Sequence, residues 1–332
     1  MNKSPCRGRV VTFSLCRFSL LLHTPSMFET LAIVLPIFLI IAMGVGAAGT
    51  GLLSDRVGEG LSDFVFVIAI PVLLFRTLAT APLPEAQPLF YWLAYFGGLA
   101  CVWLLTTWLG RKNFGLSSQE AAIAGFTTAQ SNTVFVGIPL VLRAFGEQGA
   151  VPLFLLIAIH LPITMTVATL LVEKADDSGA RWTTMLKRLF QHPILLGILA
   201  GLAFRLSGLE LPLALASATK LMADAAAPTA LFALGMTLKR YGLSTSLPLA
   251  GMISSLKLIV HPALVYGLAF HVLPMPPVWA AVAVLFAACP CGVNAYLLAQ
   301  RYQVGVAMTS GSIALSTLLA VGSMTFWLWL VT

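Results

Sequence analysis

Two segments of this 332-residue chain place amide and hydroxyl side chains beside proline and glycine within otherwise apolar sequence. The first segment runs from Thr127 to Pro139 and the second from Ala288 to Tyr296. A proline removes one helical N–H, and its ring clashes with the carbonyl four residues earlier, so a helix breaks or kinks there. Freed backbone groups cost several kcal/mol each in hydrocarbon unless they line a cavity or are buried in protein. The two segments therefore predict a pair of broken helices around a polar site.

Candidate substrate-binding residues follow from these segments. Asn132 and Asn294 can satisfy freed backbone groups or bind a ligand, and the half-helix N-termini beside them favour an anionic carboxylate. The alternative is two proline kinks packed against neighbouring helices, with the two asparagines bridging helices. On the first interpretation the segments contribute the binding residues Asn132, Thr133, Gly137, Pro139, Pro290 and Asn294.

Ionisable residues inside apolar runs are functional candidates, because a charge in the membrane is costly. Lys257 lies at least ten residues from either end of its run and joins the binding set, with a structural salt bridge as the alternative. Lys220 and Asp224 are four residues apart, which favours a local ion pair over binding of a coupling ion. His160 could relay protons, but a hydrogen-bonded packing histidine is the favoured interpretation.

Composition identifies the class of protein. Charged residues make up 9% of the chain and apolar residues 59%, against about 25% and 45–50% in an average soluble domain. The mean hydropathy is +0.94. The net charge of +7 comes from basic residues between apolar runs, which argues against a nucleic-acid surface. Five cysteines give no disulfide framework, and Cys289-Pro290-Cys291 lacks the spacing of a metal or redox motif, so no cofactor is expected.

The apolar runs are long enough to be membrane spans, since about 20 residues cross a hydrocarbon core. We therefore predict an all-α polytopic membrane protein. The ten predicted spans cover residues 29–49, 57–79, 89–109, 119–143, 151–172, 191–207, 211–238, 247–272, 278–300 and 306–331.

The distribution of Lys and Arg predicts the orientation. One set of loops holds ten of these residues and the alternate set three, so the first set is expected in the cytoplasm and both ends of the bundle outside. Residues 1–26 carry four basic side chains and no acid, which would place positive charge on the wrong face. We therefore expect 1–26 to be a non-native extension before a start at Met27, or a presequence.

The two halves of the chain repeat each other. Pro36 and Pro193, Gly44 and Gly201, and Pro71 and Pro228 share one offset of 157 residues. Five spans per half is an odd number, so the second half must be inserted upside down, as in secondary transporters. We predict repeats over 27–172 and 191–332, joined by a cytoplasmic loop over 173–190, with the fourth and ninth helices broken and crossing.

Five stretches of the sequence resemble the auxin efflux carrier family, and among its members the bacterial branch that includes malonate transporters. The resemblance covers Met27 to Thr332. It implies ten spans in two inverted repeats, with roles for Asn132, Pro139, Pro290 and Asn294 where helices four and nine cross. Cys289-Pro290-Cys291 departs from the family, in which a small residue or second proline is expected beside Pro290. The stretches are MFETLAIVLPIFLIIAMGVG (27–46), SNTVFVGIPLVLRAFG (131–146), PTALFALGMTL (228–238), LKLIVHPALV (256–265) and PCGVNAYLLAQRY (290–302).

These observations predict a secondary transporter of a small organic anion, a mono- or dicarboxylate, in the bacterial cytoplasmic membrane. The sequence has no nucleotide-binding P-loop, so coupling to H+ or Na+, or uniport, is expected. The expected partners are the anion and membrane lipid, and the resemblance adds a homodimer. A channel or sensor is the alternative, and an intramembrane enzyme is disfavoured because paired catalytic groups are missing from the sequence.

Overall fold

A computed structural model describes residues 26–80, 88–174, 193–238 and 247–332 of the chain. Over these ranges the chain is almost entirely helical, and the one β-type pairing is an isolated bridge between Ser131 and Cys291. Seven of the described helices are long and apolar enough to cross a membrane. The predicted class, an all-α polytopic membrane protein, is confirmed. Residues 1–25 and most of the predicted 173–190 loop lie outside the described residues.

The first half begins with a helix capped by Ser26, whose side chain accepts from the backbone N–H of Glu29 while that residue's carboxylate accepts from the Ser26 N–H. Such a capping box satisfies backbone donors that a helix N-terminus leaves free. The elements in chain order are α1 (Met27–Gly49), α2 (Asp55–Phe64), the π turn η1 (Val65–Ala69), α3 (Ile70–Thr80), α4 (Leu89–Phe114), α5 (Ser118–Ala129), the π turn η2 (Thr133–Gly137) and α6 (Ile138–Lys174).

The second half has the same kinds of elements. Its helices are α8 (Pro193–Leu206), α9 (Leu213–Leu238), α10 (Leu247–Ser255), η3 (Leu256–Val260), α11 (His261–Gly267), η4 (Leu268–Val272), α12 (Pro277–Ala288), α13 (Val293–Tyr302) and α14 (Val306–Val331). Both predicted spans with polar centres are interrupted, the fourth between α5 and η2 and the ninth between α12 and α13. Predicted spans four and five share α6, in which Gly146 has a left-handed φ of 55° where two helices meet.

Proline explains where the π turns lie. Pro71, Pro139 and Pro262 each stand two residues after the last residue of a π turn, namely η1, η2 and η3. Proline has no N–H to give to the carbonyl four residues earlier, and its ring presses on that carbonyl. A π turn widens the helix by one residue and shifts the hydrogen-bond partners, so the helix continues through the proline. At these three prolines the helix is widened rather than stopped, whereas Pro36 and Pro228 lie inside α-helices that have no π turn.

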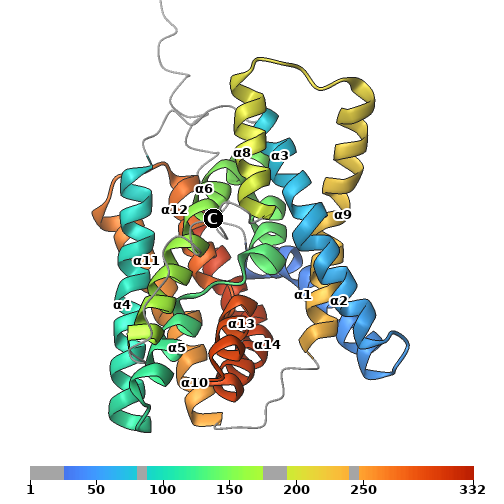
Figure 1. Cartoon of the computed structure of the whole chain (residues 1–332). Coiled ribbons are helices and arrows are strands. Elements are labelled where there is room, and N and C mark those ends of the chain that lie inside the picture. The colour runs from blue at the N-terminus through green and yellow to red at the C-terminus, as the bar shows by residue number, and fades with distance from the viewer. Residues whose placement is uncertain (1–25, 81–87, 175–192, 239–246) are drawn as a thin grey trace, which may run out of the picture.

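Figure 1 shows two groups of helices: α1, α2, α3, α8 and α9 on one side, and α4, α5 and α10 to α14 on the other. In the first group, α1 packs along α9 and α8 packs along α3. Glycine permits both contacts. A Cβ on Gly44 would collide with the carbonyl oxygen of Phe232, and one on Gly201 would lie 2.7 Å from that of Phe75. Small residues let membrane helices approach this closely.

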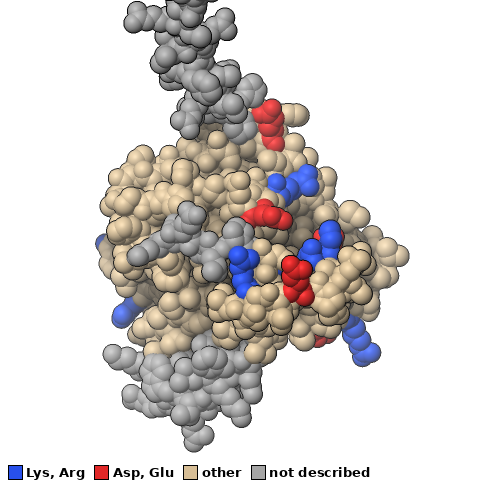
Figure 2. All heavy atoms as spheres, turned by 90° about the horizontal axis from the view of Figure 1, so that it is seen from above, with Lys and Arg blue, Asp and Glu red and all other residues tan. Residues whose placement is uncertain are grey.

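Aromatic side chains fill the centre of the second group. Tyr91 and Tyr95 of α4, Phe126 of α5 and Phe286 of α12 are among the largest fully buried residues. Apart from Lys257, none of the described Lys, Arg, Asp and Glu side chains is buried. On the face seen in Figure 2, a few basic and acidic side chains lie near one another on a mostly uncharged surface. That face has no continuous basic patch of the kind nucleic acid requires.

Candidate binding site at the crossing of two interrupted helices

The two interruptions pair with each other through their backbones. α5 ends at Ala129 and α12 at Ala288, and the chain is not helical again until Thr133 and Val293. Between these points Asn132 N–H donates to the Pro290 carbonyl over 2.9 Å, and Gly292 N–H donates to the Gln130 carbonyl over 2.9 Å. The crossing therefore satisfies backbone groups that each break leaves free, which the interior of a membrane protein requires.

Neighbouring helices hold each interruption in place. Oγ1 of Thr164 in α6 donates to the side-chain oxygen of Gln130 over 3.0 Å. On the other side, the backbone N–H of Cys291 donates to Oγ of Ser316 in α14 over 3.0 Å. The crossing segments are thus fixed by hydrogen bonds from both halves of the chain.

Asn132 lies at the centre of this arrangement as the N-cap of the helix that begins with η2. Its side chain makes no cap hydrogen bond, and its Nδ2 atom is buried without a partner among the described residues. Buried amide groups are nearly always hydrogen-bonded, so an unused donor here requires an explanation. A ligand that accepts a hydrogen bond would provide one.

Lys257 reaches the crossing from η3. Its side chain is fully buried, and Nζ lies 2.5 Å from Oγ of Ser131 and 3.1 Å from Nδ1 of His261. None of the Asp and Glu residues that the structure describes is buried, and the one ion pair found among them joins Lys220 and Asp224. Within the described ranges, the structural salt bridge considered as the alternative role of Lys257 is not formed.

Two histidines and a tyrosine extend the polar cluster. Tyr95 lies between His160 and His261, with ring centroids 5.6 Å and 5.7 Å away, and its hydroxyl is 3.0 Å from Nδ1 of His160. His160 is thus the hydrogen-bonded, buried histidine that the sequence favours. The Nε2 atoms of both histidines are buried without a partner in the described part of the chain. Sequence reasoning missed Tyr95 and His261, although the Lys257–His261 spacing of four residues signals one helical face.

The remaining predicted residues fall into three groups. Thr133 and Gly137 lie in η2 at the crossing, where a Cβ on Gly137 would be 3.1 Å from Sγ of Cys289. Pro290 lies in the second interruption, and Asn294 is half-buried in the first turn of α13. Pro139 differs from expectation. The break precedes Thr133, and Pro139 lies inside α6, because η2 accommodates its missing N–H.

Lys220 and Asp224 form the local ion pair that their spacing favours. Nζ and Oδ2 are 2.6 Å apart, and each side chain is 60% exposed on α9. Unlike Asn132 and Lys257 at the crossing, neither side chain of this pair is buried.

Comparison with known proteins identifies the family of this chain. Residues 30–328 match the sequence profile of a family described as membrane transport protein. A Rhizobium meliloti (strain 1021) protein, provisionally named a malonate transporter, is 32% identical over 92% of this chain and 97% of its own length. Uncharacterized transporters from Methanothermobacter thermautotrophicus and Methanocaldococcus jannaschii are 27% and 22% identical, over 89% and 90% of this chain and 96% and 98% of their own lengths.

The family and these relatives are transporters rather than enzymes, as the motifs predicted. The chain belongs to the membrane transport protein family, which includes the auxin efflux carriers.

Proposed function

We propose that this protein is a secondary carrier for a small organic anion, a mono- or dicarboxylate such as malonate, in the bacterial cytoplasmic membrane. The anion binds where the two interrupted helices cross. One observation carries the proposal: Lys257 is fully buried at the crossing, and no described carboxylate pairs with it.

The charge of Lys257 needs a partner. An isolated ammonium in a low-dielectric interior is costly unless it is paired and hydrogen-bonded. Ser131 and His261 accept two of its three N–H bonds and supply no negative charge. A carboxylate on the third N–H would neutralise the ammonium and complete its hydrogen bonds.

The other free groups are also donors. An ammonium that donates to Nδ1 of His261 fixes that imidazole as neutral with its hydrogen on Nε2. This Nε2–H and the Nδ2 of Asn132 are buried without partners among the described residues. The helix N-termini at Thr133 and Val293 add partial positive charge at the crossing. A carboxylate accepts up to about four hydrogen bonds and suits such a donor-rich site.

Pairs of contacts support two inverted repeats. In a two-fold arrangement, a contact between residue i and residue j recurs with the roles of the halves exchanged. Gly44 lies against the Phe232 carbonyl, and Gly201 lies against the Phe75 carbonyl. Both the glycines and the phenylalanines differ by 157 residues, so one contact is the other with the halves exchanged.

The crossing has the same property. The bond from Asn132 to Pro290 is matched by the bond from Gly292 to Gln130, and each donor differs from its counterpart by 160 residues. This matching supports ten spans in two repeats over 27–172 and 191–332. With this offset, three residues longer than the 157 of the glycine contacts, we propose Gly292 rather than Asn294 as the counterpart of Asn132. The unused amide therefore occurs in one half only, and the site is asymmetric.

Transport requires the site to open to each side in turn. We propose that α4, α5 and α10 to α14, together with α6, which packs against α5 and α12, move against α1, α2, α3, α8 and α9 by an elevator or rocking motion (Figure 1). From the distribution of Lys and Arg between the loops, we propose that both ends of the bundle lie outside. Coupling to H+ or Na+ is a further part of the proposal, and a homodimer is proposed by analogy with the family.

Counterflow in proteoliposomes tests the function. Purified protein is reconstituted with unlabelled malonate inside, and uptake of labelled malonate is followed with no gradient, with a proton gradient and with a sodium gradient. We expect saturable counterflow that other small carboxylates inhibit and neutral analogues such as malonamide do not. Absence of uptake of every carboxylate tested, under every gradient, would refute the proposal. Currents far above carrier turnover would instead identify a channel.

A further inference from the structure

We propose that the C-terminal end of α4 binds an anionic phospholipid, with Arg111 on the phosphate and the acyl chain along Leu104 and Trp108. This site is separate from the crossing and does not depend on the transported substrate. It rests on a surface hollow, on a graded helix face and on two cations without an acidic partner.

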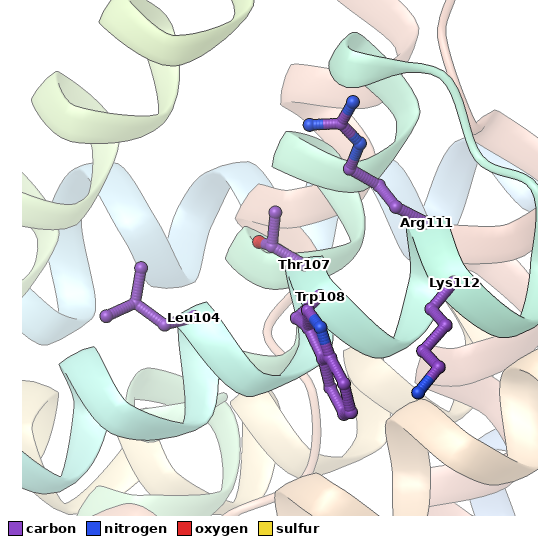
Figure 3. Close-up of a pocket in the computed structure, with 5 residues that line it drawn as sticks. All are labelled: Leu104, Thr107, Trp108, Arg111 and Lys112. Atoms are coloured by element: carbon purple, nitrogen blue, oxygen red, sulfur yellow. The ribbon is translucent and has the colours of Figure 1, made fainter.

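The hollow lies on the surface of α4 and has a volume of about 530 Å³. It is shallow and widely open to its surroundings, because its whole lining comes from the last three turns of one helix (Figure 3). The lining residues are Leu104, Thr107, Trp108, Arg111 and Lys112.

The exposed side chains of α4 change from apolar to charged along the helix, as a phospholipid changes from its acyl chain to its phosphate. Leu104 is 71% exposed and Trp108 is 54% exposed, and Arg111 follows about one turn later, with its exposed side chain pointing away from Trp108 (Figure 3). A helix rises 1.5 Å per residue, so these three residues span about 10 Å. Tryptophan prefers the membrane–water interface, and arginine the headgroup level beyond it. The apolar, aromatic and cationic levels therefore match the acyl chain, the glycerol region and the phosphate.

The cations have complementary roles. Nζ of Lys112 lies 4.8 Å from the ring centroid of Trp108, and Figure 3 shows both side chains pointing the same way while Arg111 points to the other side. Neither cation belongs to an ion pair among the described residues. The guanidinium fork of Arg111 matches the geometry of a phosphate bidentately, while Lys112 adds a second charge and orients the indole.

The apolar part of the hollow selects a lipid over a free phosphate ion. A free phosphate ion would bind Arg111, but it has no apolar part that could cover Leu104 and Trp108. Anionic lipid attracts basic residues next to membrane helices, and basic pockets there bind lipid headgroups. A diacyl phosphoester therefore uses the whole surface, whereas inorganic phosphate uses one residue of it.

Lipid bound here would rest on the helix that supports the crossing. Oγ1 of Thr107 donates to the Ala121 carbonyl of α5 over 3.3 Å, and Gly125 of α5 leaves no room for a Cβ beside Trp103. Because α5 leads directly into the first interruption, occupancy of the hollow should stabilise the α4–α5 pair.

Native mass spectrometry of the detergent-purified full chain tests the proposal. Wild type, R111Q/K112Q and R301Q are each titrated with phosphatidylglycerol and with phosphatidylcholine. Arg301 is a matched control, because it too lies over an aromatic ring, 5.5 Å from the Tyr302 centroid, but outside the hollow. We expect phosphatidylglycerol to bind wild type and R301Q alike, and R111Q/K112Q about tenfold more weakly. Millimolar inorganic phosphate should not displace it.

Three outcomes would overturn the proposal. R111Q/K112Q could bind phosphatidylglycerol as tightly as wild type does, or wild type could bind phosphatidylcholine as tightly as phosphatidylglycerol. The third is displacement of phosphatidylglycerol by inorganic phosphate. A second readout covers a variant that folds poorly. Phosphatidylglycerol with brominated acyl chains should quench wild-type tryptophan fluorescence more than that of W108F. Brominated phosphatidylcholine should show no such difference. Equal quenching of wild type and W108F by the anionic lipid would also count against the site.

Discussion

Nζ of Lys257 lies 2.5 Å from Oγ of Ser131, so a side chain from the predicted eighth span reaches the interruption of the fourth. The π turn η3 bears this lysine, and Pro262 two residues beyond the turn accounts for the π turn. The same helix face supplies His261, which accepts from Lys257 over 3.1 Å. Pro262 therefore affects the crossing, because the π turn before it sets the helix register in which Lys257 and His261 lie on one face.

Replacement of Lys257 should separate anion binding from folding. Lys257→Met removes the cation but keeps an unbranched side chain of similar length. A hydrogen bond to a charged group contributes about 1.5–3 kcal/mol, so we expect apparent anion affinity to fall about 10- to 100-fold. The melting temperature should stay the same or rise, because an apolar residue replaces a buried charge. Counterflow with graded malonate concentrations measures the first effect and thermal unfolding in detergent the second.

Lys257→Arg is the matched control, since it retains the charge with a different shape. We expect partial counterflow from it, above that of the methionine variant. If Lys257→Met transports malonate as wild type does, Lys257 is not the anchor for the anion.

The asparagines should differ from each other. Asn132→Ala removes a buried donor that lacks a partner, so transport should fall about tenfold while stability is unchanged. Asn294→Ala should also lower transport, by a smaller factor, because Asn294 is half-buried and is not the counterpart of Asn132. Counterflow normalised to folded protein, measured by fluorescence-detected size-exclusion chromatography, checks both. Equal loss of folded protein and of transport would favour a bridging, structural role for the amides.

Much of the fold could be predicted because each span is encoded locally. The predicted span over 306–331 coincides with α14, and that over 247–272 coincides with α10 to η4, since length and apolarity alone define such helices. The polar interruptions could also be predicted, because proline and glycine change the backbone conformation of the residues next to them. Pro139 shows the limit of this local reasoning: the proline was visible, but the widened turn that absorbs it was not.

Only some of the site residues could be predicted from the sequence, for a related reason. Lys257 and His160 stood out because ionisable groups are rare in apolar runs. Tyr95 and Ser131 did not, since tyrosine and serine are common in spans and only the fold brings them together from α4 and the crossing. Partners that meet across about 126 residues of sequence cannot be read from spacing within one helix.

Gly292 should be indispensable to the crossing. A Cβ there would lie 2.9 Å from Cγ of Gln130 and 3.0 Å from the Ser131 carbonyl oxygen. Gly292→Ala should therefore push the paired segments apart and reduce counterflow more than tenfold, with a lower melting temperature. Gly267→Ala is the control, because nothing lies within 4 Å of its Cβ position. Similar behaviour of the two variants would mean that the crossing tolerates separation.

The exchanged glycine contacts should respond alike to substitution. Gly44→Ala and Gly201→Ala each place a methyl group against a backbone carbonyl of the facing helix, and overpacking of this kind costs about 1–3 kcal/mol. We expect both variants to lower the thermal unfolding midpoint by comparable amounts. Gly46→Ala, in the same helix as Gly44 but with nothing within 4 Å, should not lower it. A large effect at one glycine and none at the other would argue against the two-fold relation.

The Lys220–Asp224 pair provides a test of where ion coupling can occur. Both side chains are 60% exposed on α9 and pair with each other, whereas the crossing residues are buried. Because the pair lies on the exposed side of α9 and not among the buried residues of the crossing, Asp224→Asn and Lys220→Gln should each change counterflow less than about twofold. Their dependence on proton and sodium gradients should match that of wild type. A contrary result would place the coupling ion elsewhere. If Asp224→Asn abolished stimulation by one gradient while leaving counterflow without a gradient intact, the coupling ion would bind on α9. The ion-binding site would then extend beyond the crossing. Under the arrangement proposed here, loss of gradient stimulation should instead follow substitution at the crossing itself.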